Sequence, residues 1–227
     1  MLVTIENVLS VEELALARQL LDQSRWSSGA VTAGRQAVQA KNNQQLPENA
    51  EHLPRLRRLV LEALGRNGVF FSAALPLHIL PPFFNRYVQD ANHYGFHVDN
   101  AMRRGPDGGG YIRTDVSGTL FLSEPQEYEG GVLRIADTFG THGVKLKAGT
   151  LVVYPSSSVH EVTPVTSGQR LGCFMFMQSM VRDPQRRRLL FDMDVALTTL
   201  RRDQGESEAI VSLTNTYHNL LRHWAES

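Results

Sequence analysis

The sequence has 227 residues, 42% of them hydrophobic, a formal net charge of zero and a single cysteine, Cys173. A chain of this length can bury a substantial core without disulfides or a structural metal, and one cysteine excludes an internal disulfide framework. Equal numbers of basic and acidic residues argue against a large basic surface that binds nucleic acid or an anionic membrane. No run approaches a transmembrane span, and the first residues lack the pattern of a secretory signal. We therefore expect a cytoplasmic protein with no nucleic-acid or membrane partner.

Helices are predicted in the first part of the chain. Ser10 is followed three residues later by Glu13, a capping-box pattern that predicts a helix over residues 11 to 24. Apolar residues at helical spacing predict a second helix over residues 52 to 66. The polar segment between them, residues 27 to 50, is predicted to be a loop, with a strand inside it as an alternative.

From about residue 77, short runs of β-branched and aromatic residues alternate with turn residues, which predicts a β-sandwich or barrel. A stretch rich in Gly, residues 103 to 115, interrupts these runs and is predicted to be a mobile loop, either an ordinary surface loop or a lid over a site. The predicted strands lie in FFNRYV, HYGFHVD, VSGTLFLS, GGVLRIA, GVKLKAG, TLVVYP, VHEVTPV and RLGCFMFMQSM.

Two helices are predicted at the C-terminal end, from Asp183-Pro184 to about residue 202 and from about 206 to 224, with DQGE as the turn. The chain is thereby divided into a main domain, residues 1–182, and a helical hairpin, residues 183–227. The apolar stripes of the hairpin either pack on the barrel or form a homodimer interface that uses Tyr217 and Trp224.

The stretch HYGFHVDN, which begins at His93, has the residue types of a metal site and two interpretations. On a helix, His93 and His97 would share a face, as in zinc sites whose first histidine is followed by a glutamate. Tyr94 occupies that place instead, and Gly95 costs about 1 kcal/mol relative to Ala inside a helix. On a strand, side chains alternate with period two, so His97 and Asp99 point the same way. The strand-forming neighbours favour this second interpretation.

One imidazole and one carboxylate need a third ligand, and two histidines with one carboxylate are the signature of non-haem Fe(II) oxygenases. His160 is the best candidate, because it opens a short strand directly after TLVVYPSSS. Ten residues later Arg170 begins another strand, on the face that it shares with two phenylalanines. A buried guanidinium needs an anion, and its two-bond fork suits a carboxylate. The other histidines are predicted to be surface or turn residues or, for His78, a core residue: His52, His78, His142, His218 and His223.

Taken in order, these residues resemble the motifs of a known family, the Fe(II)- and 2-oxoglutarate-dependent dioxygenases of the prolyl 4-hydroxylase-like branch. Within that branch the chain is most similar to the PKHD-type hydroxylases, over most of its length. The resemblance rests on His97-Val98-Asp99, EGGVL at residues 129–133, Tyr154-Pro155 ahead of His160, and Arg170, with further similarity at Trp26 to Gly29 and in AKNNQQL.

The resemblance implies a mainly β protein with flanking helices, whose core is a double-stranded β-helix, a jelly-roll of the cupin type. It implies that His97, Asp99 and His160 are the iron ligands and that Arg170 holds the distal carboxylate of 2-oxoglutarate. Tyr87 is implied to line the co-substrate pocket, with a purely structural role in the core as the alternative. Fe(II) would be the cofactor, 2-oxoglutarate and O2 the co-substrates, and ascorbate a candidate reductant.

The implied activity is a hydroxylation coupled to the oxidative decarboxylation of 2-oxoglutarate to succinate. The resemblance leaves the primary substrate open among a protein side chain, a peptide and an iron-chelating metabolite; it also suggests a link to iron uptake. Two alternatives are kept. An oxidative demethylase acting on a nucleobase is disfavoured by the neutral charge. A barrel that binds a metal or small ligand without turnover is disfavoured by the complete ligand set together with Arg170.

Overall fold

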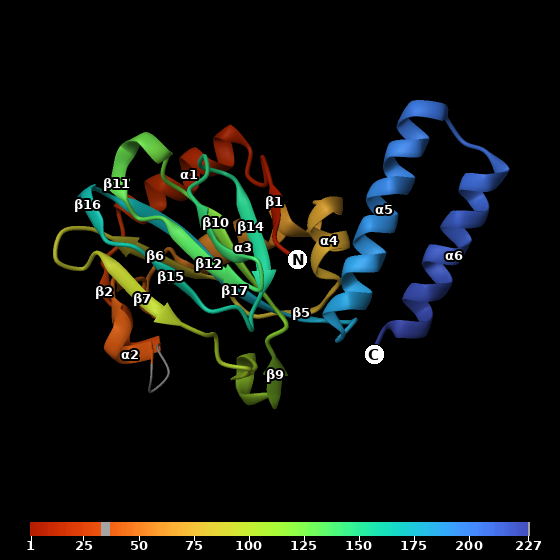
Figure 1. Ribbon diagram of the computed structural model, residues 1–227. Helices are drawn as coiled ribbons and strands as arrows, with labels where there is room; N and C mark the ends of the chain where they lie inside the picture. The colour runs from red at the N-terminus through yellow and green to blue at the C-terminus, as the bar shows by residue number, and fades with distance from the viewer. Residues whose placement is uncertain (33–36, 227) are drawn as a thin grey trace.

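Two antiparallel β-sheets form the centre of the computed structural model, which describes residues 1–32 and 37–226 (Figure 1). The larger sheet has the order β1 (Val3–Ile5), β14 (Leu151–Pro155), β10 (Val116–Phe121), β17 (Arg170–Ser179), β6 (Phe83–Tyr87), β4 (Gln44–Gln45) and β2 (Ser27–Ser28), and β5 (Pro76–Ile79) also pairs with β17. The smaller sheet has the order β13 (Gly140–Val144), β12 (Leu133–Asp137), β15 (His160–Val162), β7 (His93–His97) and β3 (Lys41–Asn42). This confirms the predicted jelly-roll core.

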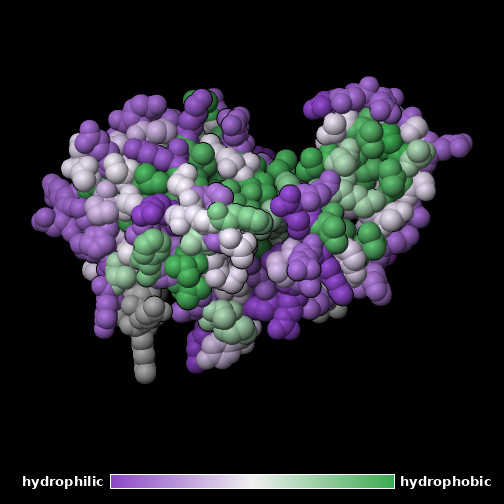
Figure 2. Space-filling model, in the orientation of Figure 1, coloured by the Kyte–Doolittle hydropathy of each residue, from purple (hydrophilic) through white to green (hydrophobic). Residues whose placement is uncertain are grey.

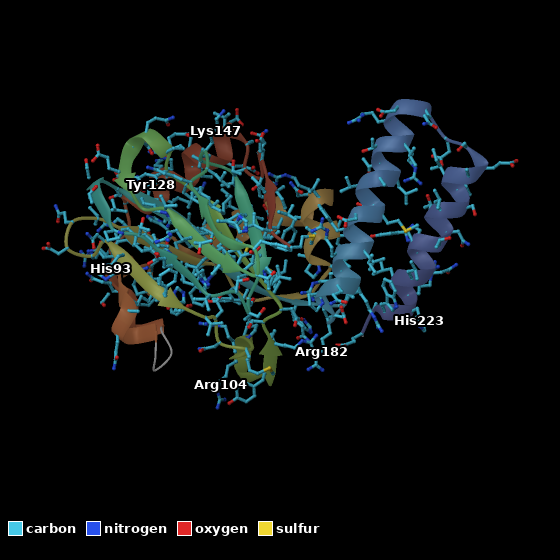
Figure 3. All side chains as sticks on the ribbon, in the orientation of Figure 1. His93, Arg104, Tyr128, Lys147, Arg182 and His223 are labelled. Carbon is cyan, nitrogen blue, oxygen red and sulfur yellow. The ribbon has the colours of Figure 1, made fainter. Side chains whose placement is uncertain are left out.

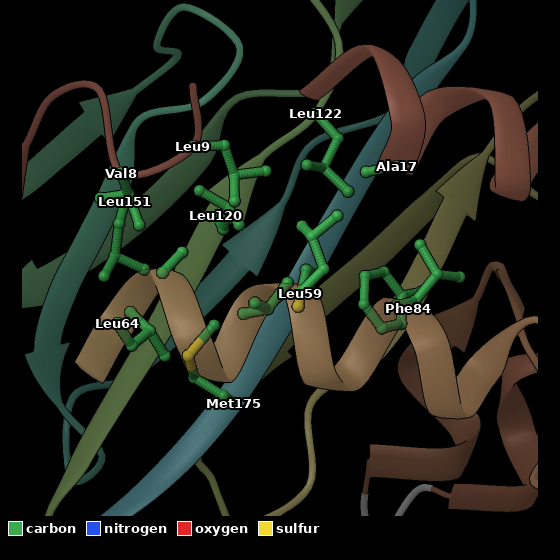
Figure 4. Close-up of a cluster of buried hydrophobic side chains, with 14 of the residues drawn as sticks. Val8, Leu9, Ala17, Leu59, Leu64, Phe84, Leu120, Leu122, Leu151 and Met175 are labelled. Atoms are coloured by element: carbon green, nitrogen blue, oxygen red, sulfur yellow. The ribbon is translucent and has the colours of Figure 1, made fainter. Parts of the chain in front are cut away.

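The two sheets bury one apolar cluster between them, and the outer face of the larger sheet buries another against helices. The cluster between the sheets takes residues from both, among them Phe121 and Val152 from the larger and Ile135 from the smaller. In the second cluster, helix α3 (Leu53–Gly65) lies across the strands and places Leu59 and Leu64 against the larger sheet (Figure 4). The site described below opens between the sheets, so both clusters hold its walls in place.

Most of the predicted elements are confirmed. Helix α1 (Val11–Asp22) begins at the predicted capping box, where the Glu13 backbone N–H donates to Ser10 Oγ and the Ser10 backbone N–H donates to the Glu13 carboxylate. Helix α4 (Gly68–Ala74) was not predicted, because its seven residues are too short for a clear periodicity. The segment at 27–50, predicted to be mainly loop, holds the short strands β2, β3 and β4 and helix α2 (Ala37–Ala40), apart from residues 33–36, which lie outside the described part.

Two predictions about the strands are wrong. The segment at 103–115 is not structureless, because β8 (Met102–Arg104) and β9 (Tyr111–Arg113) pair as a hairpin around a short 3-10 turn (Figure 1). That this hairpin closes over the site stays a prediction. The strand expected in GVKLKAG lies earlier, as β13, because a tight turn after Asp137 requires pairing with β12 to begin at Gly140. Two further short strands, β11 (Tyr128–Gly130) and β16 (Val165–Gly168), pair with each other.

The C-terminal helices α5 (Pro184–Gln204) and α6 (Glu208–Trp224) form the predicted hairpin, which projects to one side of the sheets (Figure 1). Together with Leu75 and Val181 they bury a third cluster, which includes Leu197 and Tyr217. Helix α5 contacts α4, so the hairpin packs on a helix outside the barrel. Apolar surface gathers on this part of the molecule (Figure 2), where Val195 and Val211 are exposed. The homodimer stays a prediction.

None of the helices in the described part of the chain combines the length and the apolar composition that crossing a membrane requires.

Candidate active site

The strand interpretation of HYGFHVDN is confirmed. β7 ends at His97 and pairs with β15, so that His97 and His160 are direct partners across the ladder. Asp99 follows two residues after His97, where the strand has ended. His93, the partner that a helical zinc site would need, hydrogen-bonds its neighbour Asn92 instead (Figure 3). The pairing of β7 with β15 therefore joins residues 63 positions apart in the chain at one point of the sheet.

His97, Asp99 and His160 form the single cluster of three potential metal ligands that the described residues contain. Their ligand atoms all lie within 4.8 Å of one another, and His160 Nε2 lies 3.8 Å from Asp99 Oδ2. Each Nδ1 lies near a backbone carbonyl, that of Gly95 at 2.8 Å for His97 and that of Ser158 at 3.0 Å for His160. A carbonyl only accepts, so each Nδ1–H donates and each Nε2 keeps its lone pair for a metal.

The surroundings fix the orientation of Asp99 and the charge of His97. Ser117 Oγ donates to Asp99 Oδ2 at 2.6 Å and lies 2.7 Å from Ser156 Oγ, so the carboxylate is held from outside the cluster. Burial, followed by the charge of the neighbouring His160, lowers the pKa of His97 to about 3. The neutral imidazole, which is the form that binds metals, is thus the form His97 has near neutral pH.

Arg170 is fully buried, with 1% of its surface exposed, at the first position of β17. Its guanidinium lies 5.1 Å from the ring centres of both Tyr87 and Phe121. Its Nε and Nη2 have no hydrogen-bond partner in the part of the chain that the structure describes. A buried cation with unused donors is costly unless an anion satisfies it. The structure thus bears out the buried position that period two predicted, and it gives the guanidinium a reason to bind a carboxylate.

One cavity connects Arg170 with the three clustered ligands and opens to solvent. Tyr87 lines it, as the resemblance implied, and Asn85 Nδ2 donates to the Tyr87 hydroxyl at 3.4 Å. Two cationic residues that were not predicted as site residues, Lys41 and Arg103, also line the cavity. They come from AKNNQQL and from the Gly-rich stretch, where no periodicity shows which way a side chain points.

The remaining histidines stay outside this cavity. His78 is exposed on β5, so the prediction of a core residue is wrong. His142 is exposed on β13 and bonds Asp137 across the hairpin at 3.0 Å, so it belongs to a strand where a turn was predicted. His223 lies on α6 (Figure 3), as predicted.

Gly131 gives the Arg170 side chain its room. Its φ is +60°, and a Cβ there would lie 3.0 Å from Arg170 Cδ and 2.8 Å from Val165 Cγ2. The backbone strain costs about 1–2 kcal/mol and overpacking typically ~1–3 kcal/mol more. We expect Gly131→Ala to lower the free energy of unfolding accordingly, as measured by urea denaturation. Gly110→Ala is the control, because Gly110 has a φ of +50° but open surroundings, and an equal loss in both variants would contradict the contact with Arg170.

Comparison with known protein families shows which family has this sequence and site. Residues 82–178 match the 2OG-Fe(II) oxygenase superfamily, and residues 184–226 match the PKHD-type hydroxylase C-terminal domain. The chain is 70% identical to a PKHD-type hydroxylase of Azoarcus sp. and 67% identical to one of Nitrosomonas europaea, in both cases over 100% of each chain. The chain belongs to the PKHD-type hydroxylases. It is therefore an oxygenase of the kind that uses Fe(II), 2-oxoglutarate and O2, and the non-catalytic barrel is set aside.

Solved structures with low sequence identity share the fold of this hydroxylase. A prolyl hydroxylase from Trichoplax adhaerens, in complex with a peptide fragment of hypoxia inducible factor, gives a TM-score of 0.56 at 17% identity, over 83% of this chain and 86% of that one. HygX from Streptomyces hygroscopicus, with nickel and 2-oxoglutarate bound, gives 0.54 at 14% identity, over 78% and 82%. Both support the jelly-roll architecture.

Proposed function

We propose that His97, Asp99 and His160 hold Fe(II) in this hydroxylase and that Arg170 binds the distal carboxylate of 2-oxoglutarate. The observation that carries this is that one cavity contains both the His-Asp-His cluster and a buried guanidinium with two unused donor nitrogens. Three protein ligands leave positions of an octahedral ion open to a co-substrate. Two neutral imidazoles and one carboxylate leave a net charge of +1 on an Fe(II) site, which favours a dianionic co-substrate.

The residues around the metal position then have separate roles in binding the co-substrate and the metal. Arg170 orients the co-substrate with a two-bond fork, and its contacts with the rings of Tyr87 and Phe121 hold the guanidinium in place. Tyr87 forms part of the wall beside it. Ser117 keeps the Asp99 carboxylate directed at the metal. With Fe(II), 2-oxoglutarate and O2 bound, the centre would supply oxidative decarboxylation of 2-oxoglutarate to succinate, coupled to hydroxylation of a primary substrate.

The biological setting belongs to the same proposal. We infer a cytoplasmic enzyme, supported by a single buried cysteine, with ascorbate as its reductant and an association with iron uptake, both taken from the family resemblance. The fold admits more than one kind of substrate, since the Trichoplax prolyl hydroxylase binds a peptide and another HygX structure contains hygromycin B.

An anaerobic titration of the purified protein, followed by visible absorption, tests the co-substrate assignment. We expect a charge-transfer band only when both Fe(II) and 2-oxoglutarate are present, because chelation needs an ion with open positions. Succinate is the matched control, because it has the distal carboxylate but no keto oxygen, and it should give no band. Bound iron without a band in the presence of 2-oxoglutarate would overturn the assignment. Admission of O2 to the loaded protein should then produce succinate.

A further inference from the structure

Three phenylalanines form an aromatic wall at one end of the cavity. Phe83 stacks on Phe174 with ring centres 5.1 Å apart, and Phe176 meets these two rings edge-on at 6.4 and 5.9 Å. Phe174 and Phe176 line the cavity directly, and both lie on β17, the strand that begins with Arg170. Phe83 and Phe174 are only partly buried, so this wall offers apolar surface to a ligand.

Two cations lie over this wall. Lys41 Nζ lies 5.5 Å from the centre of Phe174, and the Arg103 guanidinium lies 4.4 Å from that of Phe176 and 5.5 Å from that of Phe83. Burial, followed by the charge of Arg103, lowers the pKa of Lys41 to about 8. Within the described ranges the Arg103 guanidinium has no hydrogen-bond or ion-pair partner, so its donor nitrogens are available to a ligand in the cavity.

This pair of cations is separate from Arg170. A strand advances about 3.3 Å per residue, which puts the backbone of Phe174 ~13 Å and that of Phe176 ~20 Å from that of Arg170. Arg103 lies over Phe176 and Phe83, further along β17 than a five-carbon co-substrate would reach from Arg170. Lys41 Nζ donates to Gln45 Oε1 at 3.1 Å and lies 5.4 Å from the centre of the Tyr94 ring, so it adds positive charge to the same cavity. Asp99 is the single carboxylate among the residues that line the cavity, and the proposed metal would use it. The outer part of the cavity therefore has an excess of positive charge.

We propose that Lys41 and Arg103 bind an acidic group of the primary substrate, while Phe174 and Phe176, backed by Phe83, contact an apolar portion next to that group. The substrate is thus an organic anion with a carboxylate or phosphate beside an apolar, ring-sized part. Arg103 presents a fork that fits either oxyanion, and Lys41 adds a second positive charge in the same cavity. This inference rests on the proposed function, because it takes the His97, Asp99 and His160 centre as the place of reaction.

The test measures binding without turnover. Protein loaded anaerobically with Fe(II) and 2-oxoglutarate is titrated with phenylacetate, phenyl phosphate and the neutral phenylacetamide, and affinities are determined by calorimetry. We expect at least one anion to bind roughly tenfold or more tightly than the amide, since hydrogen bonds to charged groups are the stronger ones. The tighter of the two anions identifies the acidic group. Equal affinity for the anions and the amide, or no binding of either anion, would overturn the proposal.

Variants of the β8–β9 hairpin supply the controls. Arg103→Gln should abolish the preference for the anion, and Arg103→Lys should restore part of it. Arg104→Gln should keep the preference, because Arg104 is exposed on the same strand and lies over Tyr111, away from the cavity lining (Figure 3). Loss of the preference in Arg104→Gln as well, or its retention in Arg103→Gln, would contradict the assignment. The charge-transfer band separates the two hypotheses: a band without anion preference rejects this inference alone, whereas no band rejects the proposed function.

Discussion

Arg170→Ala should bind 2-oxoglutarate at least roughly 30-fold more weakly than the native enzyme while it still binds Fe(II). Truncation of one partner of a buried, hydrogen-bonded charge pair costs about 2–5 kcal/mol or more, and every 1.4 kcal/mol is tenfold in affinity. The metal ligands belong to other residues, so iron should remain. The measurement is the anaerobic absorption titration with 2-oxoglutarate, after iron content has been matched between the proteins.

Two further variants show whether the fork or only the charge of Arg170 matters. Arg170→Lys should lie between the native protein and Arg170→Ala, because a single ammonium replaces a two-bond fork and is shorter. Lys147→Ala, which removes an exposed cation at the surface (Figure 3), should leave the titration unchanged. A native-like titration for Arg170→Ala would place the carboxylate anchor on another residue, for which Lys41 and Arg103 are the remaining cations of the cavity.

The residues of the centre could be predicted from the sequence because His97, His160 and Arg170 lie at regular places in strands and Asp99 directly follows one. Period two put His97 and Asp99 on one side and turned Arg170 inward, and the structure agrees with 1% exposure for Arg170. The partner strand of β7 could not be predicted in the same way. The pairing of His97 with His160 depends on long-range strand order and on a register shift within β15, which no local pattern encodes.

The positions of Lys41 and Arg103 could not be predicted from local sequence patterns. Lys41 lies in a strand of two residues and Arg103 in a hairpin whose turn is rich in glycine, and both segments were predicted to be loops. Their positions over Phe174 and Phe176 follow from tertiary packing alone. Helix α4 was missed for a related reason, because it is short and is defined by its Asn67 cap and its buried face. The positions in the cavity of side chains from distant segments are therefore the main feature that the sequence does not predict.

Asp99→Ala should raise the Fe(II) dissociation constant by more than roughly 100-fold, and His160→Ala should do the same. Loss of a residue that only hydrogen-bonds to a metal ligand already lowers metal affinity by about 10–100-fold, so loss of a ligand itself should lower it more. Ser117→Ala should fall in that smaller range, because it removes the hydrogen bond of 2.6 Å that orients Asp99 but leaves all three ligands in place. Affinities are measured anaerobically by competition with a chromogenic chelator, and circular dichroism confirms that each variant is folded.

His93→Ala is the matched control for these losses. His93 lies on the same strand as His97 and is a histidine of the same motif, but it bonds Asn92 and stands outside the cluster (Figure 3). It should therefore bind iron like the native protein. A loss of iron in His93→Ala equal to that in His160→Ala would favour a site built on the other histidine spacing. Native affinity in Asp99→Ala would remove the carboxylate from the metal site, and with it the net charge of +1 that favours 2-oxoglutarate.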